Sequence, residues 1–277
     1  MLIGSGREVG NALIKSDHIQ AITFTGSESV GRQIAIQTVQ NLIPVQLEMG
    51  GKNPLIVLDD ADLDLAVELV VHGAFYSTGQ RCTATSRLIV TEGIYAPLVE
   101  KLEQRTLELK VGNALEEGVD IGPVVDAKQL QQNLDYVASG LSEGASLLCG
   151  GEHLPNEDGG YFFSPAIFVD VKPDMKIYQE EIFGPVLSVI KVPDYEAALE
   201  VAENTTYGLS AGIVTNSLHY AEDFKKRSSA GIVMVNLTTA GVDHHVPFGG
   251  NKASSFGPRE QGTYAKEFFT KVKTAYQ

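Results

Sequence analysis

Basic residues are scarce in this sequence. Lysine and arginine together number 21 against 35 aspartates and glutamates, which gives a formal net charge of −14. Nucleic acids and anionic membrane surfaces are bound by basic patches, so this balance argues against both as partners. An anionic cofactor remains compatible with it, because backbone amides at a helix terminus can hold a phosphate.

Cysteines and long apolar runs are scarce as well. The two cysteines, Cys82 and Cys149, do not suggest a disulfide framework and fit a reducing compartment, so we expect a cytoplasmic protein. No apolar run approaches the roughly 20 residues that a membrane helix needs. The first six residues lack the charged start and apolar core of a signal peptide. The length of 277 residues allows one large domain or two smaller ones.

Short apolar segments alternate with helix-like segments along most of the chain. This alternation predicts the α/β class, with a doubly wound and mostly parallel sheet. Strands are expected at residues 1–3, 21–24, 55–58, 86–91, 166–171, 186–192, 211–215, 231–236 and 267–273. Helices are expected from about residues 28 and 62 and at 95–110, 126–144, 194–204 and 218–227, with a polar surface loop at 150–160.

Two glycine-containing turns near the start are candidate phosphate sites. The G-x-G-x-x-x-G spacing at residues 4–10 resembles a dinucleotide fingerprint, but no full strand precedes it and a plain structural turn is the better interpretation. Gly26 and Ser27 follow a predicted strand and open a helix, whose free N–H groups favour a phosphate. Ser27 alone could equally be an N-cap and nothing more.

The candidate catalytic residues are Glu48, in the glycine-rich turn 46–52, and Cys82, after a polar turn. A thiolate can attack a carbonyl carbon, and a nearby carboxylate can activate water to release the captured group. Free cysteines are commonly just buried small hydrophobes. The neighbours of Cys82 are polar, however, and Arg81 would lower a thiol pKa. Cys149 follows two leucines and precedes two glycines, so we expect it to be structural.

Four motifs together resemble the aldehyde dehydrogenase superfamily: F-T-G-S at residues 24–27, L-E-x-G-G-K at 47–52, G-Q-x-C at 79–82 and E-E-I-F-G-P at 180–185. The resemblance runs in order over essentially the whole chain. It implies that Cys82 is the nucleophile, with its backbone N–H as an oxyanion donor.

The same resemblance assigns the remaining motif residues. Glu48 would be the general base, and Gly26 and Ser27 would hold the cofactor pyrophosphate. Glu181 would bind the hydroxyls of the nicotinamide ribose, and Phe183 would pack on the nicotinamide ring. Carboxylates accept well from vicinal hydroxyls and aromatic side chains shape a ring slot, so both roles suit the residue types.

The loop at residues 241–250 resembles the substrate mouth of the family, which makes Phe248 a substrate-binding candidate. Arg81 would bind the carboxylate of an acidic substrate, or would be a plain surface cation. We expect no metal site, because adjacent histidines such as His244 and His245 cannot easily point at one ion. The P-F-G-G and S-S-F-G-P-R-E-Q-G segments look most like the branch oxidising 2-ketoglutarate semialdehyde (2,5-dioxopentanoate), with the succinate semialdehyde branch as the alternative.

Members of this family carry most of the cofactor domain upstream of the segment that matches Met1, including an asparagine of the oxyanion hole. We therefore expect a C-terminal portion, with residues 1–48 as a remnant of the dinucleotide-binding domain and 49–250 as the catalytic domain. Residues 251–277 would return to the cofactor domain and supply an oligomerisation strand. The cofactor would be NAD or NADP, and the complete protein a homo-oligomer. The alternative is a catalytically silent subunit, or one that needs a partner chain.

Overall fold

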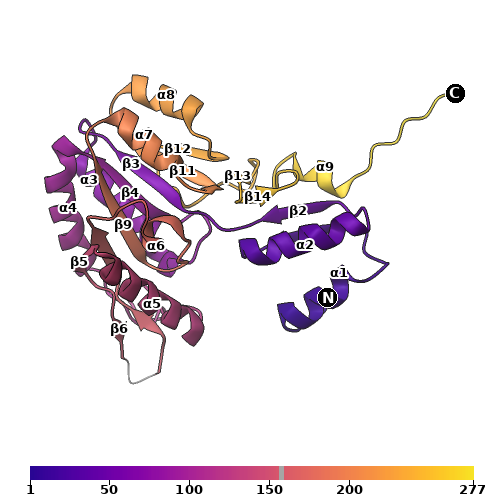
Figure 1. Ribbon diagram of the computed structural model, residues 1–277, viewed down its shortest axis with the longest axis horizontal. Coiled ribbons are helices and arrows are strands. Elements are labelled where there is room, and N and C mark those ends of the chain that lie inside the picture. Colours follow the sequence, from indigo (N-terminus) through magenta and orange to yellow (C-terminus); the bar gives the residue numbers. More distant parts are fainter. Residues whose placement is uncertain (156–158) are drawn as a thin grey trace. The chain divides into compact units, whose positions relative to one another are not determined.

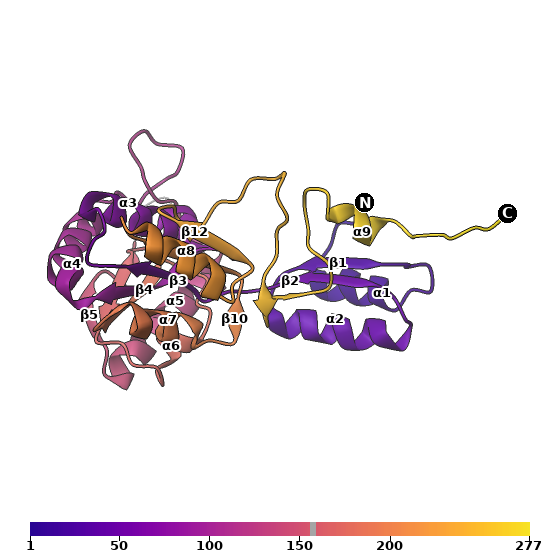
Figure 2. The ribbon, with the colours of Figure 1, turned by 90° about the horizontal axis from the view of Figure 1, so that it is seen from above.

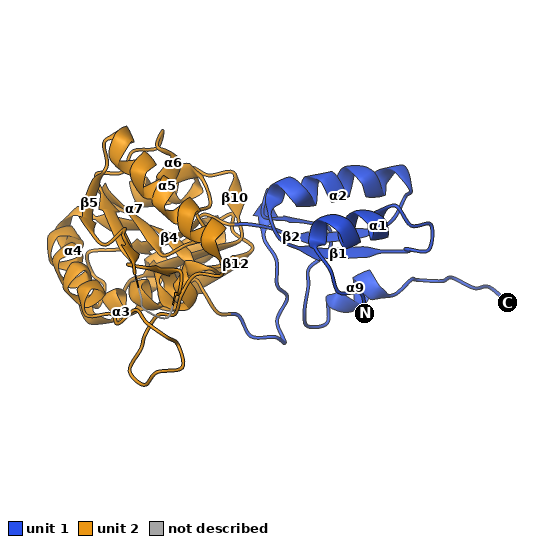
Figure 3. Ribbon diagram, turned by 90° about the horizontal axis from the view of Figure 1, so that it is seen from below, with its two compact units in different colours: residues 1–50, 242–277 blue, residues 51–241 orange. Residues whose placement is uncertain are grey.

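The computed structural model describes residues 1–155 and 159–277. The chain divides into two compact units, which Figure 3 shows in different colours. Unit 1 comprises residues 1–50 and 242–277, and unit 2 comprises residues 51–241. Residues 49–50 and 242–250, which the sequence analysis grouped with the catalytic domain, thus belong to unit 1.

Unit 2 is built on a seven-stranded sheet with the strand order β12-β11-β3-β4-β9-β8-β5. All neighbouring strands are parallel except β5, which runs antiparallel to β8 at the edge. This confirms the predicted doubly wound, mostly parallel sheet. The strands are β3 (Asn53–Val57), β4 (Thr85–Thr91), β5 (Ser146–Cys149), β8 (Ala166–Val169), β9 (Val186–Val192), β11 (Ser210–Val214) and β12 (Ile232–Val235).

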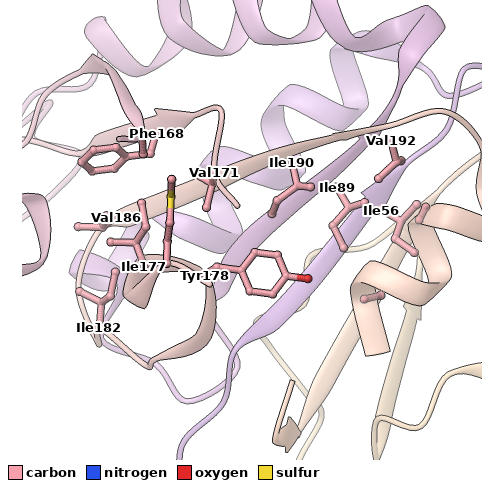
Figure 4. Close-up of a cluster of buried hydrophobic side chains, with 14 of the residues drawn as sticks. Ile56, Ile89, Phe168, Val171, Ile177, Tyr178, Ile182, Val186, Ile190 and Val192 are labelled. Atoms are coloured by element: carbon pink, nitrogen blue, oxygen red, sulfur yellow. The ribbon is translucent and has the colours of Figure 1, made fainter. Parts of the chain in front are cut away.

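Helices cover both faces of this sheet, as Figures 1 and 2 show. Side chains alternate along a strand, so the inner strands of the sheet contribute to two cores. Leu55 and Val57 of β3 pack against α3 (Leu63–Ala74) and α4 (Glu92–Leu107). Ile56 points to the other face. There the core includes residues of α5 (Ala127–Glu143), α6 (Lys176–Gln179), α7 (Tyr195–Glu203) and α8 (Leu218–Arg227). Figure 4 shows part of this core, with Ile56 and, from α6, Ile177 and Tyr178.

Shorter elements complete unit 2. A short turn with left-handed residues, η2 (Tyr76–Gly79), follows α3, and β10 (Tyr207–Gly208) precedes β11. The expected loop at 150–160 contains one arm of a small antiparallel pair, β6 (His153–Leu154) with β7 (Phe162–Phe163). Residues 156–158 of that expected loop lie outside the described residues.

Unit 1 has a three-stranded sheet in which β1 (Ile22–Thr25) runs parallel to β2 (Val45–Glu48) and β14 (Ser255–Phe256) runs antiparallel to β2. Its core is small, formed by Ile34 of α2 (Glu28–Gln40) with Leu47 and Met49. The other elements of unit 1 are η1 (Gly6–Gly10, a π-helix), α1 (Asn11–Ile14), β13 (Asn251–Lys252) and α9 (Ala265–Phe269).

Two predicted strands of unit 1 are wrong. Residues 1–3 form no strand, and the expected oligomerisation strand at 267–273 is replaced by the end of α9 followed by a segment without regular structure. Alternating apolar residues stabilise a strand only where one face is buried. Here Phe269 and Val272 are 69% and 98% exposed, so the alternation has no buried face.

Within the residues that the structure describes, none of the helices has the length and apolar character needed to cross a lipid bilayer.

Candidate active site

Three of the sequence motifs meet at one edge of the sheet in unit 2. Residues 51–52 lead into β3, Cys82 lies shortly before β4, and residues 181–185 lead into β9. The strands β3, β4 and β9 are parallel neighbours, so their amino ends lie at the same edge. Ligands of open α/β sheets generally bind at the carboxyl ends of the strands. This site lies instead at the edge formed by the amino ends of the strands.

The turn that carries Cys82 follows a strained piece of backbone. Ser77, Thr78 and Gly79 have consecutive φ values of 55°, 55° and 63°, in the left-handed region. A β-branched residue such as Thr78 rarely adopts this conformation, and such strain concentrates at functional sites. Gly79 packs closely on residues 181–185, called here the Glu181 loop. A Cβ at Gly79 would lie 2.4 Å from the carbonyl oxygen of Gly184. The packing joins the Cys82 turn to that loop.

The two cysteines differ in their surroundings. Cys82 is half-buried in its polar turn. Burial, with a smaller effect of Glu103, raises the pKa of Cys149 to about 11. Cys149 therefore stays protonated and unreactive at neutral pH, because only the thiolate is a strong nucleophile.

Gly51 lies between Cys82 and Glu181. Its N–H donates to Oε1 of Glu181 over 3.0 Å. A Cβ at this position would lie 2.8 Å from the carbonyl oxygen of Cys82. Only a glycine lets the turn before β3 approach both neighbours, so the two residues are gathered into one site of unit 2.

Phe183 has a left-handed backbone, with φ of 57°, and its side chain is 37% exposed. The loop is held from α5, because Nε2 of Gln129 and Nε2 of Gln132 donate to the carbonyl oxygen of Ile182 over 3.1 and 2.8 Å. A strained, partly exposed aromatic residue on a fixed loop is a suitable surface for a planar ring.

Lys52 is a charged residue of this region to which the sequence analysis gave no role. Its side chain is 1% exposed, and its Nζ has no hydrogen-bond partner among the described residues. Burial, together with the charge of Arg87, lowers the pKa of Lys52 to about 7, against the smaller opposing effect of Glu181. Lys52 is thus poised between its two charge states near neutral pH.

Arg81, the predicted carboxylate-binding residue, turns toward α3. Its Nη2 donates to the carbonyl oxygens of His72 and Gly73 in the last turn of that helix. Its Nε is buried without a partner in the described part of the chain. A cation at a helix C-terminus is favourable in itself, so this contact suffices to explain Arg81. Its role toward substrate stays a prediction.

Glu48, the predicted base, belongs to unit 1. It ends β2 and is 2% exposed. Ser255 Oγ donates to its Oε2 over 2.6 Å, and the N–H of Gly250 donates to Ser255 Oγ over 2.6 Å. Burial raises the pKa of Glu48 to about 7; the Ser255 hydrogen bond opposes this rise, Glu260 adds to it and Arg259 opposes it. A base with a pKa near neutral pH suits general base catalysis.

The other predicted residues of unit 1 are placed as follows. Gly26 and Ser27 are exposed at the N-terminus of α2, and the Ser27 side chain makes no capping hydrogen bond. Phe248 is half-buried and pairs through its backbone with Glu260. The ring centroids of His244 and His245 lie 5.8 Å apart. The described residues contain no group of three or more potential ligands placed to hold a metal ion.

The model of the aldehyde dehydrogenase family matches residues 1–275. The chain belongs to the aldehyde dehydrogenase family. It is 49% identical to the alpha-ketoglutaric semialdehyde dehydrogenase of Bacillus subtilis, covering 100% of this chain and 57% of that protein. It is 42% identical to the 2,5-dioxopentanoate dehydrogenase of Saccharolobus solfataricus, covering 100% of this chain and 58% of that protein.

Among solved structures, the NAD-dependent aldehyde dehydrogenase of Sinorhizobium meliloti superposes with a TM-score of 0.93 at 35% identity. The match covers 96% of this aldehyde dehydrogenase chain and 52% of that structure. The chain thus spans somewhat more than half the length of the relatives it matches.

Proposed function

We propose that this aldehyde dehydrogenase chain carries the cysteine and glutamate chemistry that oxidises an aldehyde to a carboxylic acid. The Cys82 thiolate attacks the aldehyde carbon, and the backbone N–H of Cys82 donates to the developing oxyanion. The nicotinamide cofactor, when bound, accepts the hydride. The resulting thioester on Cys82 is hydrolysed by a water from which Glu48 takes a proton. The observation that carries the proposal is the packing of the half-buried Cys82 turn against Gly51 and the Glu181 loop.

The residues of the site fit a nicotinamide cofactor. Glu181 lies on a loop held by α5, and its Oε1 accepts from the N–H of Gly51 over 3.0 Å, which orients the carboxylate for ribose hydroxyls. Phe183 offers a partly exposed ring. In unit 1, the exposed N-terminus of the 13-residue helix α2 at Gly26 and Ser27 suits a pyrophosphate. We propose NAD as the cofactor, with NADP as the alternative, because the Sinorhizobium meliloti structure is of an NAD-dependent enzyme.

The substrate that we propose is 2-ketoglutarate semialdehyde. Its support is the pair of relatives at 49% and 42% identity, whose names give this substrate. Arg81 and Phe248 are the proposed contacts, Arg81 for the substrate carboxylate and Phe248 for the substrate chain. Comparing kcat/KM for this aldehyde and for succinate semialdehyde tests the choice, and equal or faster oxidation of succinate semialdehyde would contradict it.

The catalytic assignments are tested by following cofactor reduction with substrate. Cys82→Ser is expected to abolish the reaction, because a hydroxyl is a far weaker nucleophile than a thiolate at neutral pH. Glu48→Gln is expected to give one burst of reduced cofactor per chain followed by a stall. A burst with unchanged steady-state turnover would refute the role of Glu48.

A silent subunit, or one that needs a partner chain, is the alternative function, and the coverage of 57% and 58% of its relatives favours keeping it. Calorimetric titration of NAD and NADP into the purified chain, together with a turnover assay, distinguishes an active enzyme from a silent subunit. Saturable binding with turnover supports the enzyme, and no binding with either cofactor supports the silent subunit. Location in the cytoplasm and homo-oligomerisation remain predictions.

A further inference from the structure

Three successive carbonyl groups of the Cys82 turn accept hydrogen bonds from buried side chains. Nδ2 of Asn53 donates to the carbonyl oxygen of Cys82 over 2.8 Å and to that of Ala84 over 2.9 Å. Oγ1 of Thr239 donates to the carbonyl oxygen of Thr83, between them, over 2.8 Å. Both donors are buried, with exposed fractions of 2% and 0%.

These two donors are themselves fixed by the sheet. Oδ1 of Asn53 accepts from the N–H of Ser210 over 3.0 Å, so one side chain on β3 bridges the first residue of β11 and the turn before β4. Thr239 is held through its carbonyl oxygen by Oγ of Ser210 over 2.9 Å and through its hydroxyl by Oγ1 of Thr85 over 2.7 Å. The network is uncharged, and each of its members is buried.

We infer that Asn53, together with Thr239, is a positioning residue for the nucleophile. The inference rests on the proposed function, in which Cys82 attacks the substrate. A peptide unit is planar, so a carbonyl held inward by Asn53 fixes the orientation of the Cys82–Thr83 peptide. The backbone at Ser77 and Thr78 is strained, so the turn would change to a less strained conformation if these hydrogen bonds were lost. The network thereby restrains the backbone that carries the Cys82 sulfur and so holds the sulfur in the attacking geometry.

The sharpest test is Asn53→Asp. The two side chains have the same shape, and the aspartate can still accept from the N–H of Ser210. An ionised aspartate cannot donate to the carbonyl oxygens of Cys82 and Ala84. We expect acylation of Cys82 by p-nitrophenyl acetate, followed as nitrophenolate release per folded chain, to slow about tenfold to 100-fold, since a small misplacement of reacting groups costs this much. The pH midpoint of Cys82 alkylation by iodoacetamide should also rise.

Thr239→Val is the second variant, in case the buried aspartate prevents folding. It removes the donor to Thr83 without introducing a charge and should slow acylation in the same sense. Thr215→Val is the matched control. Thr215 is 3% exposed, lies just after β11 and donates to the Asp60 carboxylate over 2.7 and 2.9 Å. It follows the carboxyl end of the strand, so its loss should lower stability but leave the acylation rate and the alkylation midpoint unchanged.

The inference is overturned if folded Asn53→Asp, or folded Thr239→Val where the aspartate variant does not fold, acylates within about twofold of the native chain. Equal slowing by Thr215→Val would overturn it as well, because the effect would then follow stability alone. Failure of the proposed function is distinguishable. If the native chain does not acylate at Cys82, the alkylation midpoints of the same variants still report whether the network sets the state of this thiol.

Discussion

Glu48 acts as a base only as a carboxylate, so its protonation should be visible in the pH dependence of thioester release. Since its pKa is raised to about 7, we expect release from Cys82 to increase as pH rises through about 7. In Ser255→Ala the carboxylate loses a donor. The pH at which release increases should then be higher by roughly one unit, because a hydrogen bond to a charged group contributes about 1.5 kcal/mol. The measurement is steady-state nitrophenolate release between pH 5 and pH 9 in the native chain, the Ser255 variant and the exposed control Ser142→Ala. A Ser255→Ala profile that stays in place would contradict the assignment.

Lys52 carries a cost in stability that also depends on pH. Its pKa falls from 10.5 to about 7 in the folded chain, so the unfolded chain holds the proton more tightly. The free energy of unfolding should therefore increase as pH rises from about 7 toward 10.5. Lys52→Met removes this cost, and we expect it to raise the free energy of unfolding at pH 6 by roughly 1 to 4 kcal/mol.

Urea unfolding at pH 6 and at pH 9 measures this effect. The gain from Lys52→Met should shrink at the higher pH, where the native lysine is largely neutral. Lys226→Met, at an exposed position, is the control and should show no such change between the two pH values. A Lys52→Met chain that is less stable than the native chain at pH 6 would show that the ammonium group has a stabilising partner.

At the scale of the elements, the loop before β9 contains a residue with a strained backbone. Phe183 holds a left-handed conformation that a glycine adopts without strain. Phe183→Gly should raise the free energy of unfolding by up to about 1 kcal/mol and weaken NAD binding. Leu42→Gly is a matched control, because Leu42 has a φ of 53° and is 89% exposed. It should gain similar stability with unchanged NAD affinity. Urea unfolding measures the stability and calorimetry measures the NAD affinity of each variant. Equal NAD affinities in the two variants would contradict a ring-packing role for Phe183.

Elements with a buried face could be predicted from local pattern, and elements without one could not. The strand predicted at 186–192 is found with the same bounds, and it is buried along nearly its whole length. The strand predicted at 267–273 has the same kind of alternation but no core to face, and a short helix replaces part of it. The π-helix at residues 6–10 has no periodicity that distinguishes it from an α-helix in so short a segment.

At the scale of the whole molecule, the motif residues could be predicted and their supports could not. Cys82 and Glu181 lie in short motifs that are readable in isolation. Asn53 and Ser210, which fix the Cys82 turn, are 157 positions apart, and Ser255 is 207 positions from Glu48. Such partners follow from strand order and register, which single-sequence patterns do not give. Serine, threonine and asparagine at these positions have no local feature that marks them.

The division into two units predicts unequal local stability. Unit 2 has two extended cores, on the two faces of its sheet, whereas the core of unit 1 is the small cluster around Ile34, Leu47 and Met49. Buried apolar contacts set local resistance to opening. We expect hydrogen exchange, followed by mass spectrometry, to be slowest in β3, β4 and β9 and markedly faster in β1 and β2. Equal protection of both sheets would indicate that the units unfold as one.

The most direct test of the central claim is to locate the acyl group after reaction with p-nitrophenyl acetate. Peptide mapping of the Glu48→Gln chain should find one acetyl group on Cys82 and none on Cys149, and the group should persist for longer than in the native chain. An acetyl group absent from Cys82, or one released from Glu48→Gln as fast as from the native chain, would contradict the account.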